Sequence, residues 1–473
     1  MQGGTPAEGR VIVVAHREPF RVVQRNGVAR VERPVGGLVA ALQPVMRDTR
    51  GVWISADVDG EADRAQLERA LAELPYEWQP VRCVERVACG FYRGFSNGAL
   101  WPLYHSMPGR TVYHSSDWAA YREVNEQFAD ASAAICKRDD IAWIHDYQLS
   151  LVPQLLRARL AGRDVRIGFL LHVPFPHCSL FRTLPWAREI LLGMLGAGLI
   201  VFHVQEYCEH FFECVERLLN LRCDRLRGTV ALADRLVHVR AIPIGIDADA
   251  IRRCADQPEV VARAALLKAE VGAESLVIGV DRLDYTKGIL ERLRALELFF
   301  QTHHDRHRRV SMVQLAVPSR ESIEQYAELR EQIERQVGYL NGLYAQPGWT
   351  PVTYLYRSLP FEELVALYRA ADVAMVTPLR DGMNLVAKEF VAAHANQGGV
   401  LVLSELAGAA QQLTEAVLVN PYDVTAMSET LTRALEMPAE EQERRMRRLN
   451  AKISRFDIHH WCDTFLAECR FVE

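Results

Sequence analysis

Residues 373–389 read VAMVTPLRDGMNLVAKE, and this stretch decides the fold class. Its first four residues are apolar, as in a strand buried on both faces, and the run from Leu385 has the apolar spacing of a helix. The loop between them contains Gly382, whose backbone a ligand can approach closely. Such a junction presents backbone N–H groups and the positive end of a helix dipole to an anion. Glu389 follows Leu385 by one helical turn, where its carboxylate can accept the hydroxyls of a ribose. On local features alone, an ordinary strand–helix loop with a solvated Glu389 is the alternative.

The same alternation of buried strands and helices runs through the whole chain. The apolar, strand-like runs are 11–15, 141–145, 166–171, 199–203, 237–241, 276–280, 312–317, 352–356, 373–376, 400–403 and 417–419. Helical patterns between them predict βαβ units and doubly wound parallel sheets. Pro243 and Gly245 interrupt the pattern, so we expect domains at 1–243 and 244–455. An amphipathic helix in 456–473 is expected to pack back on the first domain. Two such Rossmann-like domains face a cleft at the carboxyl ends of their strands.

Composition excludes several classes of protein. The chain has 473 residues, 49% of them hydrophobic and 24% charged, and its formal net charge is -5. These values are ordinary for a globular protein and argue against a nucleic-acid binder. The longest near-apolar run, 190–202, is shorter than the ~20 residues of a membrane span. With no leader-like start, we expect a cytoplasmic protein with reduced cysteines. The spacing of Cys208, His210 and Cys214 matches no common zinc pattern, and no metal site is expected.

Four further polar groups follow predicted strands. Residues 35–38 read VGGL and open a helix, where glycines let a phosphate or sugar approach the backbone. Asp146 and His172 each stand at the end of a strand, although a lone histidine there is more often structural. Arg282 and Lys287 follow the strand at 276–280 and lie beside a glycine. Two such cations suit a diphosphate, and a capped helix with exposed cations is the alternative.

Taken in order, these segments resemble the trehalose-6-phosphate synthase family of retaining glycosyltransferases, which has the GT-B fold of two Rossmann-like domains. The resemblance runs from Val11 to about Cys462. It is most specific in 95–97 (FSN), 100–102 (LWP), 144–147 (IHDY), 172–176 (HVPFP), 282–288 (RLDYTKG) and the stretch 373–389 quoted above. It implies a hexosyltransferase that moves glucose from ADP-, GDP- or UDP-glucose to a phosphorylated acceptor. No cofactor and no enzyme nucleophile are implied. Stimulation by a divalent metal, a partner phosphatase and assembly into a homo-oligomer stay open.

The resemblance also implies residue roles, which local spacing alone does not give. On the donor side, Arg282 and Lys287 would hold the diphosphate, Gly37 would lie against it, and Glu389 would bind the ribose. The donor glucose and phosphates would be bound, largely through backbone N–H groups, by Asp381, Gly382, Met383, Asn384 and Leu385.

Around the reacting carbon, His172 would hydrogen-bond the donor sugar and support an oxocarbenium-like transition state, and Asp146 would bind acceptor hydroxyls. The catalytic set is therefore His172, Asp146, Arg282 and Lys287. The acceptor's phosphate is assigned to Arg17, Tyr92 and Arg320, and the wall of its pocket to Trp101.

The acceptor is where this chain departs from the trehalose pattern. The first strand ends in Ala15-His16-Arg17-Glu18 instead of Ser-Asn-Arg, and Ala56 stands about where a tryptophan packs on glucose 6-phosphate. The start at 16–19 (HREP), with 105–108 (HSMP) and 115–118 (SSDW), resembles the glucosylglycerol-phosphate synthases, a branch of the same family. We therefore expect sn-glycerol 3-phosphate as acceptor and glucosylglycerol phosphate, a compatible solute, as product.

Three alternatives stay open. The nearest is an α,α-trehalose-phosphate synthase that uses glucose 6-phosphate. A pseudo-glycosyltransferase is disfavoured by the intact segment 282–287. A non-catalytic sugar-phosphate sensor would be expected to lose His172, Arg282 or Lys287, and the sequence retains all three.

Overall fold

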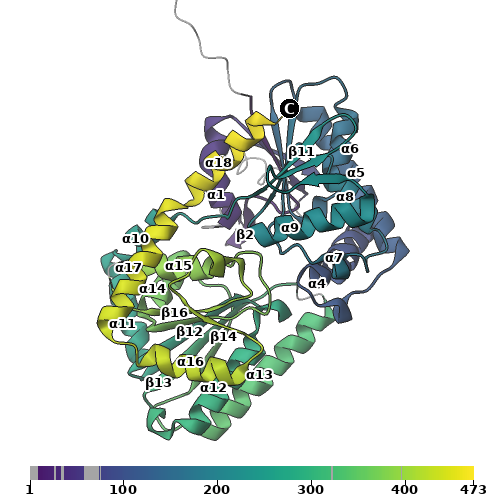
Figure 1. The fold of residues 1–473 in the computed structure, drawn as a ribbon. Coiled ribbons are helices and arrows are strands. Elements are labelled where there is room, and N and C mark those ends of the chain that lie inside the picture. The colour runs from purple at the N-terminus through teal and green to yellow at the C-terminus, as the bar shows by residue number, and fades with distance from the viewer. Residues whose placement is uncertain are drawn as a thin grey trace, which may run out of the picture. The chain divides into compact units, whose positions relative to one another are not determined.

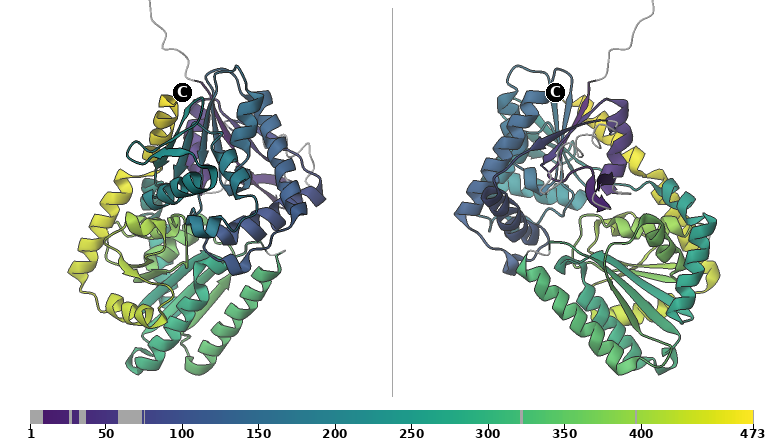
Figure 2. Two further views of the ribbon diagram at one scale, coloured as in Figure 1. Left: turned by 45° about the vertical axis from the view of Figure 1, so that its right-hand side comes forward. Right: turned by 180° about the vertical axis from the view of Figure 1, so that it is seen from behind.

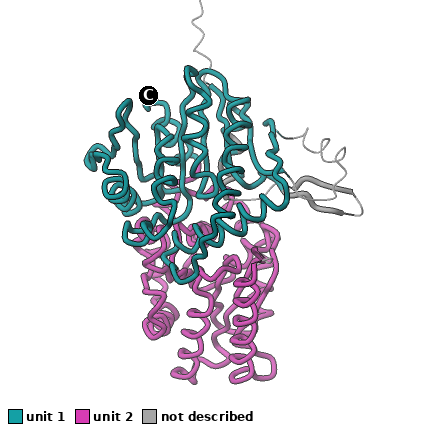
Figure 3. The backbone as a smooth tube through the Cα atoms, turned by 90° about the vertical axis from the view of Figure 1, so that its right-hand side faces the viewer, with its two compact units in different colours: residues 1–244, 459–473 teal, residues 245–458 magenta. Residues whose placement is uncertain are grey.

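The structure is a computed structural model that describes residues 9–25, 28–32, 37–57, 74, 76–320, 323–395 and 397–472. Its chain divides into two compact units (Figure 3). Unit 1 comprises Met1–Ile244 with His459–Glu473, and unit 2 comprises Gly245–Ile458. The predicted domains 1–243 and 244–455 end one and three residues before these boundaries.

Unit 1 is built on one large sheet whose strand order is β5-β4-β1-β6-β7-β8-β11-β10-β9. The first seven strands in this order, from β5 through β11, are parallel to one another. Strand β10 then pairs antiparallel with β11, and β9 pairs antiparallel with β10. The strands are β1 (Val11–Val14), β4 (Val52–Ala56), β5 (Glu77–Val81), β6 (Ile141–His145), β7 (Arg166–Leu170), β8 (Leu199–Phe202), β9 (Arg222–Asp224), β10 (Thr229–Ala231) and β11 (Leu236–Ala241). A separate antiparallel pair is formed by β2 (Arg21–Arg25) and β3 (Val28–Glu32).

The helices of unit 1 connect these strands (Figure 1). They are α1 (Gly37–Asp48), α3 (Glu85–Cys89), the π-helix η1 (Gly90–Leu100), α4 (Trp101–Tyr104), η2 (Pro108–Arg110), α5 (Ser115–Ile135), η3 (Tyr147–Leu149), α6 (Val152–Arg159), α7 (Cys178–Phe181), α8 (Ala187–Met194), α9 (Gln205–Cys214) and η4 (Val215–Leu219).

The C-terminal helix α18 (Ile458–Phe471) contributes aromatic side chains to the core of unit 1. Phe465 stacks on Trp143 of β6, with ring centroids 3.8 Å apart and ring planes within 7°. Trp461 lies 5.1 Å from the same ring. Because all three side chains are fully buried, this contact fixes the C-terminal segment to the middle of the unit 1 sheet.

Unit 2 is built on a six-stranded, wholly parallel sheet with the order β14-β13-β12-β15-β16-β17. The strands are β12 (Ser275–Arg282), β13 (Val310–Val317), β14 (Val352–Tyr356), β15 (Val373–Val376), β16 (Val400–Ser404) and β17 (Val417–Val419). Strand order reverses between β12 and β15. In open α/β sheets, ligands bind outside the carboxyl ends of the strands at this switch point.

Helices cover both faces of the unit 2 sheet (Figures 1 and 2). One group contains α12 (Ile289–Thr302), α13 (Glu324–Tyr344) and α16 (Val424–Leu435). The other contains α10 (Ala248–Ala255), α11 (Pro258–Val271), α14 (Phe361–Ala370), α15 (Leu385–Ala393) and α17 (Ala439–Arg455). Short helices are η5 (Tyr285–Lys287), η6 (His304–Arg306) and η7 (Gly408–Gln411).

Two parallel-sheet α/β units confirm the predicted fold class. Every predicted strand is present, whereas β2 to β5, β9 and β10 fall outside the predicted strands. Within the described ranges, no helix combines the length and the apolar character that crossing a membrane requires.

Candidate active site

The two polar loops of unit 2 meet at the switch point of its sheet. Arg282 ends β12, and the loop then passes through η5 to Gly288, where α12 begins. Gly288 has φ of 65°, and a Cβ added there would lie 2.2 Å from the carbonyl oxygen of Thr377, in the loop after β15. The N–H of Leu379 also donates to the carbonyl of Thr286, at 2.7 Å. Because Gly288 has no side chain, the loop at 282–288 can lie directly against the loop that follows β15.

Lys287 and Asp381 form an ion pair between these loops. The Nζ of Lys287 lies 2.5 Å from Oδ2 of Asp381, and both side chains are largely buried. Asn384 donates from Nδ2 to the same oxygen at 3.1 Å, while its Oδ1 accepts from the N–H of Ala387 and caps α15. The fold thus brings the predicted cation, the helix N-terminus and a carboxylate into one cluster.

Arg292 of α12 forms hydrogen bonds with both loops. It was not among the predicted site residues. Its guanidinium is fully buried, and Nη1 donates to Asp281 at 2.7 Å and to Gln314 at 2.9 Å. Nε donates to Thr377 at 3.1 Å, and Nη2 to the carbonyl of Lys287 at 3.3 Å. The available signal was an arginine on the apolar face of a predicted helix.

Arg320 lies in unit 2, in a buried network with Asp284. Its Nη1 donates to Oδ2 of Asp284 at 2.9 Å, and the hydroxyl of Tyr326 donates to the same oxygen at 3.1 Å. Burial raises the pKa of Asp284, but Arg320, Arg282 and Lys287 together with the N–H of Thr286 lower it further, so the net shift is downward. The predicted contact of Arg320 with the acceptor's phosphate stays a prediction.

Glu389 is half-buried on α15 and already has one partner. The hydroxyl of Tyr368, on α14, donates to Oε2 of Glu389 at 2.8 Å. Burial raises the pKa of Glu389, while this hydrogen bond lowers it. Tyr368 therefore orients the carboxylate and leaves Oε1 for a ligand. The sequence contains no local signal for this pair, because 21 residues separate its members.

In unit 1, Asp146 and His172 lie together because β6 and β7 are neighbours. The N–H of His172 donates to Oδ1 of Asp146 at 3.2 Å. His145, the last residue of β6, lies with Nδ1 3.1 Å from Nε2 of His172. His145 was not among the predicted site residues, although it precedes Asp146 directly.

Backbone strain marks several of these positions. Three predicted site residues have a positive φ, namely Asp146 at 73°, Arg320 at 51° and Asn384 at 76°. Asp146 combines this φ with ψ of 168°, a region that side chains other than glycine rarely occupy. Such conformations cost of order 1–3 kcal/mol each and cluster at functional sites.

Arg17 and Tyr92, two of the predicted acceptor residues of unit 1, lie at the loop after β1. Tyr92 stacks on His16, with ring centroids 4.9 Å apart and an interplanar angle of 13°. The carbonyl of Arg17 accepts from Nε1 of Trp53, and the Arg17 side chain is exposed. Trp101 is buried, 4.1 Å from His105 and 5.7 Å from Tyr147, measured between ring centroids. Gly37 begins α1, and residues 33–36 lie outside the described part of the chain.

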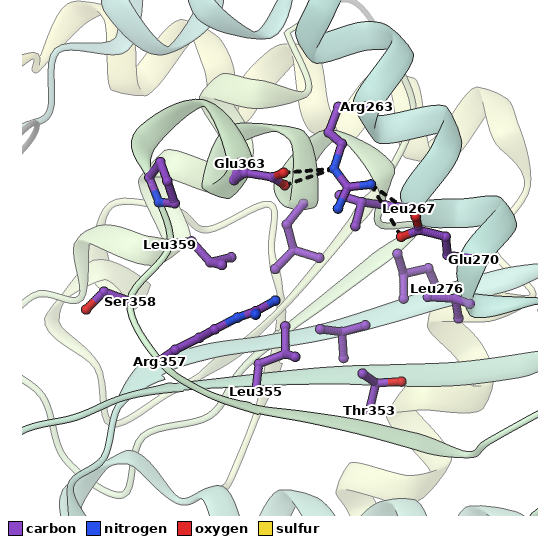
Figure 4. A pocket seen from close by; sticks show the side chains of 14 residues that line it. Arg263, Leu267, Glu270, Leu276, Thr353, Leu355, Arg357, Ser358, Leu359 and Glu363 are labelled. Atoms are coloured by element: carbon purple, nitrogen blue, oxygen red, sulfur yellow. Dashed lines mark hydrogen bonds and ion pairs between the residues drawn. The ribbon is translucent and has the colours of Figure 1, made fainter.

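A separate cavity of about 470 Å³ lies in unit 2 and is not this site (Figure 4). Apolar side chains form its floor, among them Leu355 of β14, and Arg357 extends along it. Arg263 at its edge bonds Glu363 at 2.9 Å and Glu270 at 3.3 Å. Of the predicted site residues that the structure describes, none lines this cavity.

Comparison with known proteins identifies the class of protein. The two parallel-sheet units resemble solved trehalose-phosphate synthases, which places the protein among the retaining glycosyltransferases of the GT-B fold. The family model for glycosyltransferase family 20 matches residues 9–470, and the chain belongs to that family.

Three relatives illustrate the match. The trehalose-6-phosphate synthase of Mycobacterium ulcerans is 42% identical over 466 residues, which cover 96% of this chain and 92% of that protein. An α,α-trehalose-phosphate synthase [UDP-forming] of Dictyostelium discoideum is 39% identical over 99% of this chain, which spans 63% of that longer protein. The crystal structure of an α,α-trehalose-phosphate synthase (UDP-forming) from Burkholderia xenovorans in complex with glucose-6-phosphate has a TM-score of 0.87 and 33% identity. The structural match covers 98% of this chain and 100% of the chain from Burkholderia xenovorans.

Proposed function

We propose that this chain transfers glucose from UDP-glucose to glucose 6-phosphate, with retention of configuration, to form α,α-trehalose 6-phosphate and UDP. The observation that carries the proposal is the cluster of Lys287, Asp381 and the N-terminus of α15 in a member of family 20. The names of the relatives favour glucose 6-phosphate over the sn-glycerol 3-phosphate that residues 16 and 56 led us to expect.

Unit 2 supplies the donor side of the reaction. Arg282 and Lys287 hold the diphosphate, whose negative charge grows as the bond between C1 and the phosphate oxygen breaks. Fixed cations and a helix N-terminus stabilise that growing charge without reorganising. Lys287 is already oriented by Asp381, so donor binding adds a phosphate partner to a side chain that is held in place. Glu389 accepts the ribose hydroxyls while Tyr368 orients its carboxylate.

Unit 1 supplies the groups around the reacting carbon. Asp146 accepts hydrogen bonds from the acceptor, and His172 contacts the donor sugar. The acceptor oxygen attacks C1 on the face that the diphosphate leaves, and its proton passes to a phosphate oxygen of the leaving group. One C–O bond forms as one breaks, and no enzyme nucleophile takes part.

One local feature keeps sn-glycerol 3-phosphate as the second candidate acceptor. His16 stacks on Tyr92, one of the predicted phosphate contacts, at a position where the trehalose pattern has no histidine. Ala56 leaves the neighbouring position without the large ring of that pattern.

The test is a paired acceptor assay. The enzyme is incubated with UDP-glucose and either glucose 6-phosphate or sn-glycerol 3-phosphate, with ADP- and GDP-glucose as parallel donors. Release of the nucleoside diphosphate gives the rate, mass spectrometry identifies the product, and NMR of the anomeric proton reports the configuration. We expect α,α-trehalose 6-phosphate. Exclusive formation of glucosylglycerol phosphate would overturn the proposed acceptor, and no transfer to either acceptor would overturn the activity.

A further inference from the structure

The contact between His145 and His172 defines which nitrogen of His172 is available to a ligand. His145 is 1% exposed, and its ring stacks on that of His172 with centroids 5.4 Å apart and planes within 12°. Nδ1 of His145 and Nε2 of His172 lie 3.1 Å apart, so one of the two donates a hydrogen bond to the other. The other ring nitrogen of His172, Nδ1, is the one that this pair leaves for a substrate.

Burial decides the direction of this hydrogen bond. Nε2 of His145 is buried and has no hydrogen-bond partner among the described residues. If His172 donated to Nδ1 of His145, the proton of neutral His145 would sit on Nε2 as a buried, orphaned donor, which proteins avoid. If His145 instead carries its proton on Nδ1, the proton is used and Nε2 holds only a lone pair. The favoured arrangement therefore has His145 donating and His172 accepting at Nε2.

We propose that His145 is a positioning residue that holds His172 as the neutral tautomer protonated on Nδ1, so that His172 donates from Nδ1 to a hydroxyl of the donor sugar. The role of the sugar rests on the proposed function, whereas the tautomer does not. The tautomer of a histidine is set by the hydrogen bond that its other nitrogen makes.

The surroundings of the pair support a neutral His172. Burial lowers the pKa of His172, an effect that the Asp146 carboxylate partly offsets. Burial and the neighbouring His172 lower the pKa of His145 well below its ordinary value. The rings of His203, at 5.3 Å, and of Trp461, at 6.4 Å, face His172, and the ring of Trp143 lies 5.1 Å from that of His145. Protonating Nε2 of His172 would place its N–H opposite the Nδ1–H of His145. Because two donors cannot hydrogen-bond each other, the contact disfavours protonation of His172.

Two variants separate the hydrogen bond from the packing. His145→Phe keeps a stacked ring and removes the donor, while His145→Asn keeps an N–H near the place of Nδ1 and removes the ring. We expect His145→Phe to lower kcat at least about 10-fold, since a wrong tautomer is costly in catalysis. In His145→Phe, the acid limb of the pH profile of kcat/KM should move to higher pH, because Nε2 of His172 can then accept a proton. His145→Asn should restore most of the rate and the wild-type profile.

The matched control is His394→Phe. His394 is a buried histidine of unit 2 whose ring nitrogens contact the carbonyls of Phe390 and Ala371, at 3.0 Å each. This variant should lower the Tm and leave the pH profile unchanged. A wild-type kcat and pH profile in His145→Phe would overturn the proposal.

A direct measurement keeps the proposal testable if these variants fold poorly. Histidine labelled with 15N in both ring nitrogens is incorporated into the full-length protein, and long-range 1H–15N spectra report which nitrogen carries the proton. The His172 signals are assigned by their loss in His172→Asn. A proton on Nδ1 supports the proposal, and a proton on Nε2 overturns it whether or not the protein transfers glucose.

Discussion

Replacing Arg292 by methionine tests whether the donor loops depend on one buried arginine. The side chains of Arg292 and Asp281 are 0% and 2% exposed, and their ion pair spans 2.7 Å. Methionine fills the volume of the arginine stem but leaves the Asp281 carboxylate buried without its cation. It also removes the donor that serves Gln314 and Thr377. Breaking a buried pair by removing one partner costs about 3–5 kcal/mol.

This cost converts into a temperature that calorimetry can measure. Unit 2 runs from Gly245 to Ile458 and so has 214 residues. For a domain of this size each kcal/mol lowers the Tm by about 2–4 °C, so Arg292→Met should lower the Tm of unit 2 by roughly 6–20 °C. Removing the carboxylate's charge as well, in the double variant with Asp281→Asn, should recover part of the loss.

A surface pair in the same unit provides the control. Arg309 and Glu274 lie 2.8 Å apart, and their side chains are 49% and 65% exposed. Because exposed pairs contribute little, Arg309→Met should change the Tm by less than about 2 °C. If Arg292→Met lowered the Tm no more than Arg309→Met does, the buried network would not support unit 2 as argued. Arg292→Met should also raise the donor KM, because the arginine holds the carbonyl of Lys287.

Three further predictions concern the donor side. Lys287→Ala and Arg282→Ala should each lower kcat/KM for the donor by about 10- to 150-fold, the value of a charge-assisted hydrogen bond of ~1.5–3 kcal/mol; near-wild-type kinetics in both would contradict this. Tyr368→Phe should raise the donor KM about 2- to 10-fold and leave the acceptor KM unchanged, because Glu389 loses the hydrogen bond that orients its carboxylate toward the ribose. Asp284 has a lowered pKa, so its contribution to stability is present above about pH 4 and lost as the pH falls through the folded value. The Tm of Asp284→Asn should therefore fall less than that of the wild type between pH 5 and pH 2, and parallel curves would refute this.

The parallel strands of the core were predictable because they are continuously apolar. Strand β15 (VAMV) and strand β16 (VLVLS) are buried over their whole length. The strands that fell outside the prediction lie at or near sheet edges or form a separate antiparallel pair. Strand β5 (EWQPV) contains a proline, which is tolerated at an edge, and β9 (RCD) carries mostly exposed polar side chains. For β2 and β3, the dipeptide Asn26-Gly27 was an available hairpin signal.

Site residues were predictable where the strand itself places them. Asp146 and Arg282 stand at the carboxyl end of a parallel strand, and such ends share one edge of a sheet. The contacts that orient the site were not predictable in this way. Arg292 reaches Thr377 across 85 residues of sequence, and His145 reaches His172 across 27. Sequence pattern shows that such a polar side chain is buried, but it does not show the partner that satisfies it.

His16 and Ala56, where the chain departs from the trehalose pattern, are neighbours in the fold. Strands β1 and β4 are parallel neighbours, and the N–H of Ala56 donates to the carbonyl of His16 at 3.2 Å. The two residues therefore belong to one local environment, in which a change at one position alters the space available at the other. They count as one difference from the trehalose pattern, beside the segments 105–108 and 115–118, and the relatives named as trehalose-phosphate synthases stand against these differences. A single local difference at the acceptor side can alter the fit of a sugar phosphate without altering the donor chemistry, so the acceptor has to be identified by the paired assay and not by the donor loops.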